Sequence, residues 1–114
     1  MIIVSGENIF PTEIEKFVND FKKIRLSVVV PVEDKISQNK LVLIYESNSK
    51  VKEEQIFNFL HKKISVYKIP KIALNCRQLG LDEIPKASNG KILRNKINKY
   101  TNNFFKKKKL KFNE

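Results

Sequence analysis

Two short turns of the sequence carry residues that could bind a ligand, and each contains one of the three glycines of the chain. The first, Ser5–Asn8, lies between an apolar run and Pro11. The second places Lys91 directly after Gly90. A lysine that projects from a loop can reach an anionic ligand, because its ammonium group is a compact charge on a flexible stem. An exposed lysine that only contacts water is the alternative interpretation.

The charges around the second turn are unusual for the start of a helix. Apolar residues after Lys91 recur at helical spacing and predict a helix from Lys91 onward. Lys91 and Arg94 would then lie in its first turn, where the helix dipole disfavours cations by roughly 0.3–1 kcal/mol. A residue that breaks a local rule without visible compensation is a candidate for function. This pattern favours a binding role for Lys91.

The composition indicates one folded domain. Of the 114 residues, 41% are hydrophobic and 31% are charged, which is typical of a globular chain. No apolar run approaches the ~20 residues of a membrane span and no signal peptide opens the chain, so we expect a cytoplasmic protein.

With one cysteine, Cys76, and one histidine, His61, we expect no disulfide within the chain and no metal site. We expect Cys76 in the core and His61 at the surface.

The net charge of +11 is concentrated at one end of the chain. Residues 1–85 contain 13 basic and 11 acidic side chains, whereas residues 86–114 contain 10 basic and 1 acidic. Such an excess could bind nucleic acid, a membrane surface or an acidic protein. An A/T-rich coding bias would also produce it, since lysine outnumbers arginine 20 to 3. A nucleic-acid-binding module is disfavoured, because the chain has no paired aromatic motif, no GxxG loop and few arginines.

The hydrophobic pattern predicts an α+β fold in which helices pack on one small three-stranded sheet, preceded by a short strand and turn. A capping box at Thr12–Glu15 predicts the start of the first helix. The segment Gly80–Gly90 reads as a loop with too few apolar residues to be held by the core. Strands are expected over residues 2–4, 26–32, 40–45 and 72–74, and further helices over residues 52–64 and from 91 onward.

The two turns, taken together, resemble a known family. The segments SGENIFPTEIE (residues 5–15) and PKASNGKILR (residues 85–94) are similar to two motifs in the C-terminal domain of adenylate-forming enzymes. This superfamily includes acyl- and aryl-CoA synthetases, peptide-synthetase adenylation domains and luciferases. Residues 65–71 also resemble the family's segment before the third strand, and the likeness covers residues 2–100. The form of residues 7–11 resembles the acyl-CoA synthetase branch, since peptide synthetases carry an arginine-containing turn there.

The resemblance implies a set of functional residues. The lysine that matches Lys91 enters the active site during adenylation, where its charge would stabilise the transition state, and Gly90 belongs to its loop. The turn that matches Ser5, Gly6, Glu7 and Asn8 lines the pantetheine path of CoA in the second half-reaction. The C-terminal domain rotates on a hinge between the two steps.

The resemblance also implies partners. ATP/AMP and CoA would be shared with a large N-terminal domain on the same or a separate chain, and the family implies Mg²⁺ that this chain does not bind. The substrate would be an acyl or aryl acid, with an acyl carrier protein as another acceptor. No Ser/Thr/Gly-rich phosphate loop is present, and the chain begins where the family's C-terminal domain begins. We therefore expect part of an acid–thiol ligase that is inactive alone.

The domain is expected over residues 1–105, and residues 106–114 are expected to form a basic, disordered tail. The rival is a stand-alone regulatory domain, or one that docks an acidic acyl carrier protein through its basic surface. A steep loss of binding with rising salt would support that electrostatic role.

Overall fold

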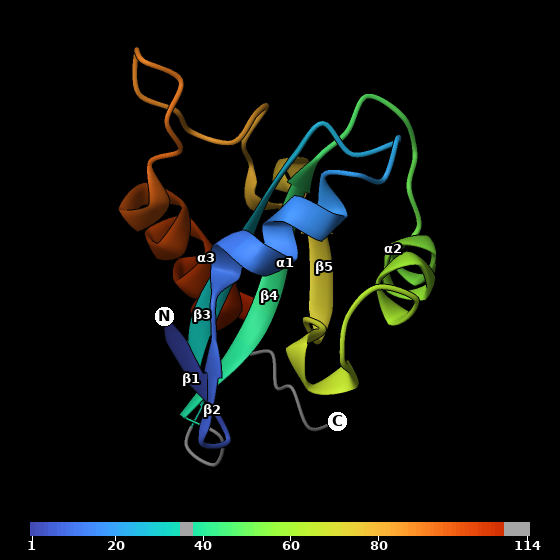
Figure 1. Ribbon diagram of the computed structural model, residues 1–114. Helices are drawn as coiled ribbons and strands as arrows, with labels where there is room; N and C mark the ends of the chain where they lie inside the picture. The colour runs from blue at the N-terminus through green and yellow to red at the C-terminus, as the bar shows by residue number, and fades with distance from the viewer. Residues whose placement is uncertain (35–37, 109–114) are drawn as a thin grey trace.

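A three-stranded sheet forms the centre of the computed structural model, which describes residues 1–34 and 38–108 (Figure 1). Strand β3 (Leu26–Asp34) pairs antiparallel with β4 (Gln38–Glu46), and β4 pairs parallel with β5 (Ile72–Asn75). These strands contain the apolar runs that the sequence predicts. The α+β fold with helices packed on a three-stranded sheet is confirmed.

Helices cover both faces of the sheet, which explains why its strands read as nearly continuous apolar runs. Helices α1 (Pro11–Val18) and α2 (Glu53–His61) pack on one face, and α3 (Arg94–Lys108) packs on the other. The sheet thus lies between α1 and α3 (Figure 1). Side chains buried on the first face include Ile14, Val18, Ile56, Leu60, Val29 and Leu43, and those on the second include Val28, Val30, Ile44 and Ile97.

The N-terminal residues form a small hairpin of their own. Strand β1 (Ile2–Val4) pairs antiparallel with β2 (Glu7–Ile9), so only Ser5 and Gly6 form the turn. Both have positive φ angles, 48° and 82°, as a two-residue hairpin turn of type I′ requires. The sequence predicts β1 and the turn but not β2, because a three-residue polar strand carries almost no periodic signal.

The predicted capping box of α1 is wrong. The helix begins at Pro11, with Phe10 as its N-cap and no side-chain hydrogen bond at the cap. Proline at the first helical position explains this start, because its fixed φ suits the helix and its missing N–H would have no partner there. The glutamate that the box required, Glu15, is buried and has tertiary partners instead.

The segment between β5 and α3 is better anchored than its composition predicts. It begins with the short 3-10 helix η2 (Cys76–Leu79) and continues to Ile84, whose side chain is 0% exposed in the core beside α3. The expectation of a loop that the core cannot hold is therefore wrong at Ile84.

The last helix begins later than the sequence predicts, and it includes part of the segment expected to be a tail. Helix α3 starts at Arg94 rather than Lys91, and it continues past the expected boundary at residue 105 to Lys108. The rest of the predicted basic tail, residues 109–114, lies outside the described residues. Within residues 1–34 and 38–108, no helix is long and apolar enough to cross a membrane.

Candidate functional site

The lysine loop, residues Pro85–Leu93, is a narrow hairpin in its own right. The Ala87 N–H donates to the Lys91 carbonyl at 2.8 Å, and the Gly90 N–H donates back to the Ala87 carbonyl at 2.9 Å. Residues 88–90 thus close a three-residue hairpin loop, a form that needs one residue in the left-handed region. Gly90, with a φ of 87°, supplies it. The glycine before Lys91 is therefore explained by the backbone of the hairpin.

The backbone of Lys91 is held by hydrogen bonds, whereas its side chain has no partner among the described residues. Its carbonyl accepts the Ala87 N–H, and its own N–H donates to Asn89 Oδ1 at 3.1 Å. The side chain is exposed, and no hydrogen bond or ion pair to it is found within the part of the chain that the structure describes. The ammonium group can therefore project toward a ligand or a partner from a well-defined position.

Lys91 precedes α3, so the prediction that it lies in the first turn of a helix, against the dipole, is wrong. The dipole acts instead on Arg94, the first residue of α3, and Glu15 compensates the charge there. Arg94 Nη2 and Nη1 donate to the two carboxylate oxygens of Glu15 at 2.6 and 2.9 Å. Hydrogen bonding to Glu15 raises the pKa of the Arg94 guanidinium above its usual value.

Two carboxylates hold the lysine loop, and sequence analysis does not identify either of them. Glu15 binds Arg94 at the end of the loop and also accepts the Val29 N–H at 2.7 Å. Glu46, the last residue of β4, accepts the Ile84 N–H at 2.9 Å at the start of the loop. The only available signal was the uncompensated cation Arg94, which implies a carboxylate from another element.

The glycine turn of the sequence analysis, Ser5–Asn8, comprises the two-residue turn Ser5-Gly6 and the first two residues of β2, and it is fully at the surface. All four residues are exposed, and a Cβ added to Gly6 would meet no other atom of the described chain within 4 Å. The turn can therefore approach a ligand closely, and only the backbone conformation of Gly6 restricts its replacement.

The structure does not bring the glycine turn and the lysine loop together. Figure 1 shows the hairpin of β1 and β2 at one end of the molecule, and the loop before α3 projects from the opposite end. The Cα atoms span 35 Å along the longest axis of the domain. One ligand of modest size cannot touch both motifs at once, so they serve different sites or different states.

Cys76 lies in the core and His61 lies at the surface, as the sequence predicts. Cys76 is 1% exposed, and burial is the main cause that raises the pKa of its thiol, which makes it a poor nucleophile. His61 is exposed at the end of α2. Within the described ranges, no three His, Cys, Asp or Glu side chains cluster in a way that could hold a metal ion.

Curated relatives of the chain are CoA ligases. It is 34% identical over 98 residues to a long-chain-fatty-acid–CoA ligase of Yersinia pestis. The matched residues cover 85% of this chain and 16% of that protein. It is 30% identical over 97 residues to a 2-succinylbenzoate–CoA ligase of Staphylococcus epidermidis, covering 85% of this chain and 19% of that one. The chain thus spans less than a fifth of the length of these relatives. No protein-family model matches it.

Solved structures of CoA synthetases have the same fold. A Mycobacterium tuberculosis fatty acyl CoA synthetase superposes with a TM-score of 0.81 at 26% identity, covering 90% of this chain and 20% of that one. The o-succinylbenzoate CoA synthetase of Bacillus subtilis, solved with an acyl-adenylate intermediate, superposes with a TM-score of 0.72 at 26% identity. It covers 83% of this chain and 19% of the synthetase.

Proposed function

Because this chain belongs to the C-terminal domains of adenylate-forming enzymes, in the acyl-CoA ligase branch, we propose that it serves an ATP-dependent acyl- or aryl-CoA ligase. In this proposal it works with a large adenylation domain, on the same or a separate chain. Lys91 acts in adenylation, and the glycine turn Ser5–Asn8 lines the path of the CoA thiol. We also expect the protein in the cytoplasm, where ATP and CoA would be its co-substrates.

The observation that carries the proposal is the separation of the two motifs. Each is a tight hairpin with a positive-φ glycine, and the two project from opposite ends of one domain (Figure 1). A domain that rotates on a hinge can present one end to the active site in the first half-reaction and the other end in the second. The geometry therefore supports two steps that use the same active site in turn.

In the first step, a carboxylate oxygen of the acid attacks the α-phosphorus of ATP, and the bond to the leaving pyrophosphate breaks. Negative charge spreads over the oxygens around phosphorus, and a positioned cation stabilises that charge more than it stabilises the ground state. The free side chain of Lys91 on its fixed backbone suits this role. In this proposal the nucleotide and the large domain would hold the Mg²⁺ that the family implies.

In the second step, the CoA thiol attacks the carbonyl carbon of the acyl-adenylate and AMP leaves. The thiol lies at the end of a long, narrow pantetheine arm, which needs a channel without bulky side chains. The open space around Gly6 suits the wall of such a channel. The exposed polar residues beside it, Ser5, Glu7 and Asn8, can hydrogen-bond the amides of the arm.

The proposal is tested by combining the chain with its large adenylation domain and measuring each half-reaction separately. Pyrophosphate exchange reports adenylation, and the acyl-CoA yield from a supplied acyl-adenylate reports thioester formation. We expect both activities to depend on this chain. If the large domain performs both steps equally well without it, the chain has a regulatory or docking role and the proposal fails.

A further inference from the structure

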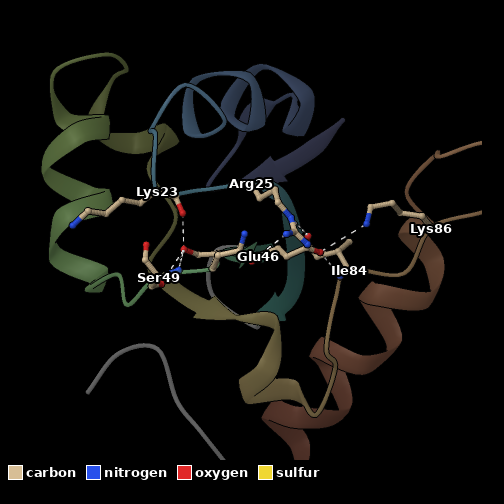
Figure 2. Close-up of polar contacts among 8 residues, drawn as sticks. Lys23, Arg25, Glu46, Ser49, Ile84 and Lys86 are labelled. Carbon is tan, nitrogen blue, oxygen red and sulfur yellow. Dashed lines mark hydrogen bonds and ion pairs between the residues drawn. The ribbon is translucent and has the colours of Figure 1, made fainter.

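A polar cluster lies beneath the start of the lysine loop, with the buried carboxylate of Glu46 at its centre (Figure 2). The residue is 5% exposed. Its Oε1 accepts the Ile84 N–H at 2.9 Å and lies 3.8 Å from Lys86 Nζ. Its Oε2 accepts a hydrogen bond from Arg25 Nε at 2.8 Å. The carboxylate therefore joins the end of β4 to two residues that flank Pro85.

The partners of Glu46 keep it charged. Burial by itself would raise the pKa of the carboxyl, but the Ile84 N–H, the Arg25 guanidinium and the Lys86 ammonium outweigh it and lower the pKa. The charge is useful at this place because Ile84 is fully buried and its N–H has no access to water. A buried N–H without a partner is costly, and a carboxylate acceptor is stronger than a neutral one.

The position of Lys91 depends on this anchor through the backbone of the hairpin. The Pro85 carbonyl accepts the Leu93 N–H at 2.9 Å, and Lys86 pairs with Ile92 across the hairpin. Lys91 immediately precedes Ile92 of that pair.

The far arm of the hairpin ends at Arg94, which Glu15 holds with two hydrogen bonds. The lysine loop is therefore attached to the domain at both ends by buried carboxylates. Glu46 extends from strand β4 and Glu15 extends from helix α1.

We propose that Glu46 is a positioning residue for Lys91: it fixes the entering arm of the lysine loop and so sets where the ammonium group lies during adenylation. Glu46 touches no substrate and acts only through the loop. The proposal rests on the function proposed above, because the position of Lys91 matters to catalysis only if Lys91 acts in adenylation. A preorganised cation loses most of its effect when its support is loose.

The first test is amide hydrogen exchange on the isolated 114-residue chain. Glu46→Ala removes the acceptor of the Ile84 N–H and the carboxylate that Arg25 and Lys86 contact, whereas Glu46→Gln keeps an acceptor oxygen and removes the charge. We expect the amides of Ile84, Ala87 and Gly90 to exchange roughly 10-fold faster in Glu46→Ala and less so in Glu46→Gln, with β3 and β4 amides unchanged. If Glu46→Ala does not fold, Glu46→Gln alone decides the result.

Glu53 offers a matched control for the exchange experiment. Its Oε2 accepts the Ala73 N–H at 2.8 Å, so it also holds the backbone of another segment through a carboxylate, but at β5. Glu53→Ala should speed exchange at Ala73 and leave the lysine loop at the rate of the unmodified chain. If the loop amides exchange equally in the unmodified chain and in both Glu46 variants, the proposal is overturned.

The second test is made on the complete ligase, this chain together with its large adenylation domain. We expect Glu46→Gln and Glu46→Ala to lower kcat of adenylation by roughly 10-fold with little change in KM for ATP and the acid, because alignment rather than binding is lost. Thioester formation from a supplied acyl-adenylate should change much less. A merely structural defect would lower both half-reactions together, and that outcome would also overturn the proposal.

The same assay separates this proposal from the function on which it rests. If Lys91→Ala slows adenylation and the Glu46 variants do not, Glu46 has no positioning role and only the present inference fails. If Lys91→Ala itself adenylates at the normal rate, the proposed function fails, and the positioning role of Glu46 in catalysis fails with it.

Discussion

Arg94 and Glu15 lie 79 residues apart in the sequence and meet through two hydrogen bonds of 2.6 and 2.9 Å. The pair joins the first residue of α3 to Glu15 on the buried side of α1. The same carboxylate accepts the Val29 N–H of strand β3. It therefore connects both helices to the sheet at the point where the lysine loop ends. A paired arginine at this position accounts for a cation where the helix dipole would otherwise disfavour one.

Replacing Arg94 by alanine should destabilise the isolated chain by about 1–3 kcal/mol. Among the described residues, the change leaves the buried carboxylate of Glu15 with only the Val29 N–H as donor, and an unpaired buried charge is costly. The partial exposure of Arg94 keeps the loss moderate. Urea denaturation measures the effect. Lys96→Ala, an exposed change on the same helix, should alter the free energy of unfolding by no more than ~0.5 kcal/mol. Equal midpoints for the two variants would contradict the role of the pair.

Acid should weaken the domain partly through Glu46. Its pKa in the folded chain is below the ordinary value of 4.5, because the Ile84 N–H, Arg25 and Lys86 outweigh the effect of burial. The ionised group therefore contributes stability that is present above pH 4.5 and is lost as the pH falls through its lower folded pKa. The difference in unfolding free energy between the unmodified chain and Glu46→Gln should be largest near neutral pH and shrink below pH 4.5. A difference that stays constant or grows toward acid would contradict this assignment.

The sequence predicts the sheet and its helices because their signals are local. The apolar runs of β3 and β4 and the helical stripe of α1 each indicate their own structure without any information from the rest of the chain. The turn at Gly6 and the lysine loop at Gly90 could also be located, because few residues other than glycine adopt a positive φ.

The anchors of the site could not be predicted, because they depend on tertiary contacts. Glu15 fits a capping box by its spacing, but the helix begins at Pro11 and the carboxylate turns to Arg94 and Val29 instead. Glu46 reads as an ordinary polar residue at the end of a strand. Only the folded chain brings the Ile84 N–H and Arg25 to it from 38 and 21 residues away. Charge pairing over such separations leaves no periodic trace in the sequence.

A side chain at Gly6 should harm the second half-reaction more than the first. Gly6→Leu strains a backbone at a φ of 82°, costing roughly 1–2 kcal/mol of stability, but its Cβ would have no atom of the described chain within 4 Å beyond the neighbouring residues. Gly80→Leu is the control, because Gly80 lies at the end of η2, away from the turn, and has a φ of 86° and equally open surroundings. It should cost the same backbone strain. In the complete ligase, only Gly6→Leu should lower the acyl-CoA yield from a supplied acyl-adenylate. Equal losses of pyrophosphate exchange and acyl-CoA yield in Gly6→Leu would refute the role of the turn.

Replacing Lys91 by alanine should separate activity from stability more sharply than any other change. The side chain is exposed and precedes α3, so its removal should change the free energy of unfolding by no more than ~0.5 kcal/mol. Removing a lysine from the first turn of a helix would have raised the stability, but Lys91 does not lie in that turn. In the complete ligase, pyrophosphate exchange should fall by roughly 10²- to 10³-fold, the loss that follows removal of one preorganised contact to the transition state. Acyl transfer from a supplied acyl-adenylate to CoA should remain nearly normal, because the opposite end of the domain serves that step. Lys99→Ala, an exposed change on α3, is the control and should leave both half-reactions unaltered. If Lys91→Ala adenylates as fast as this control, Lys91 is an ordinary surface lysine.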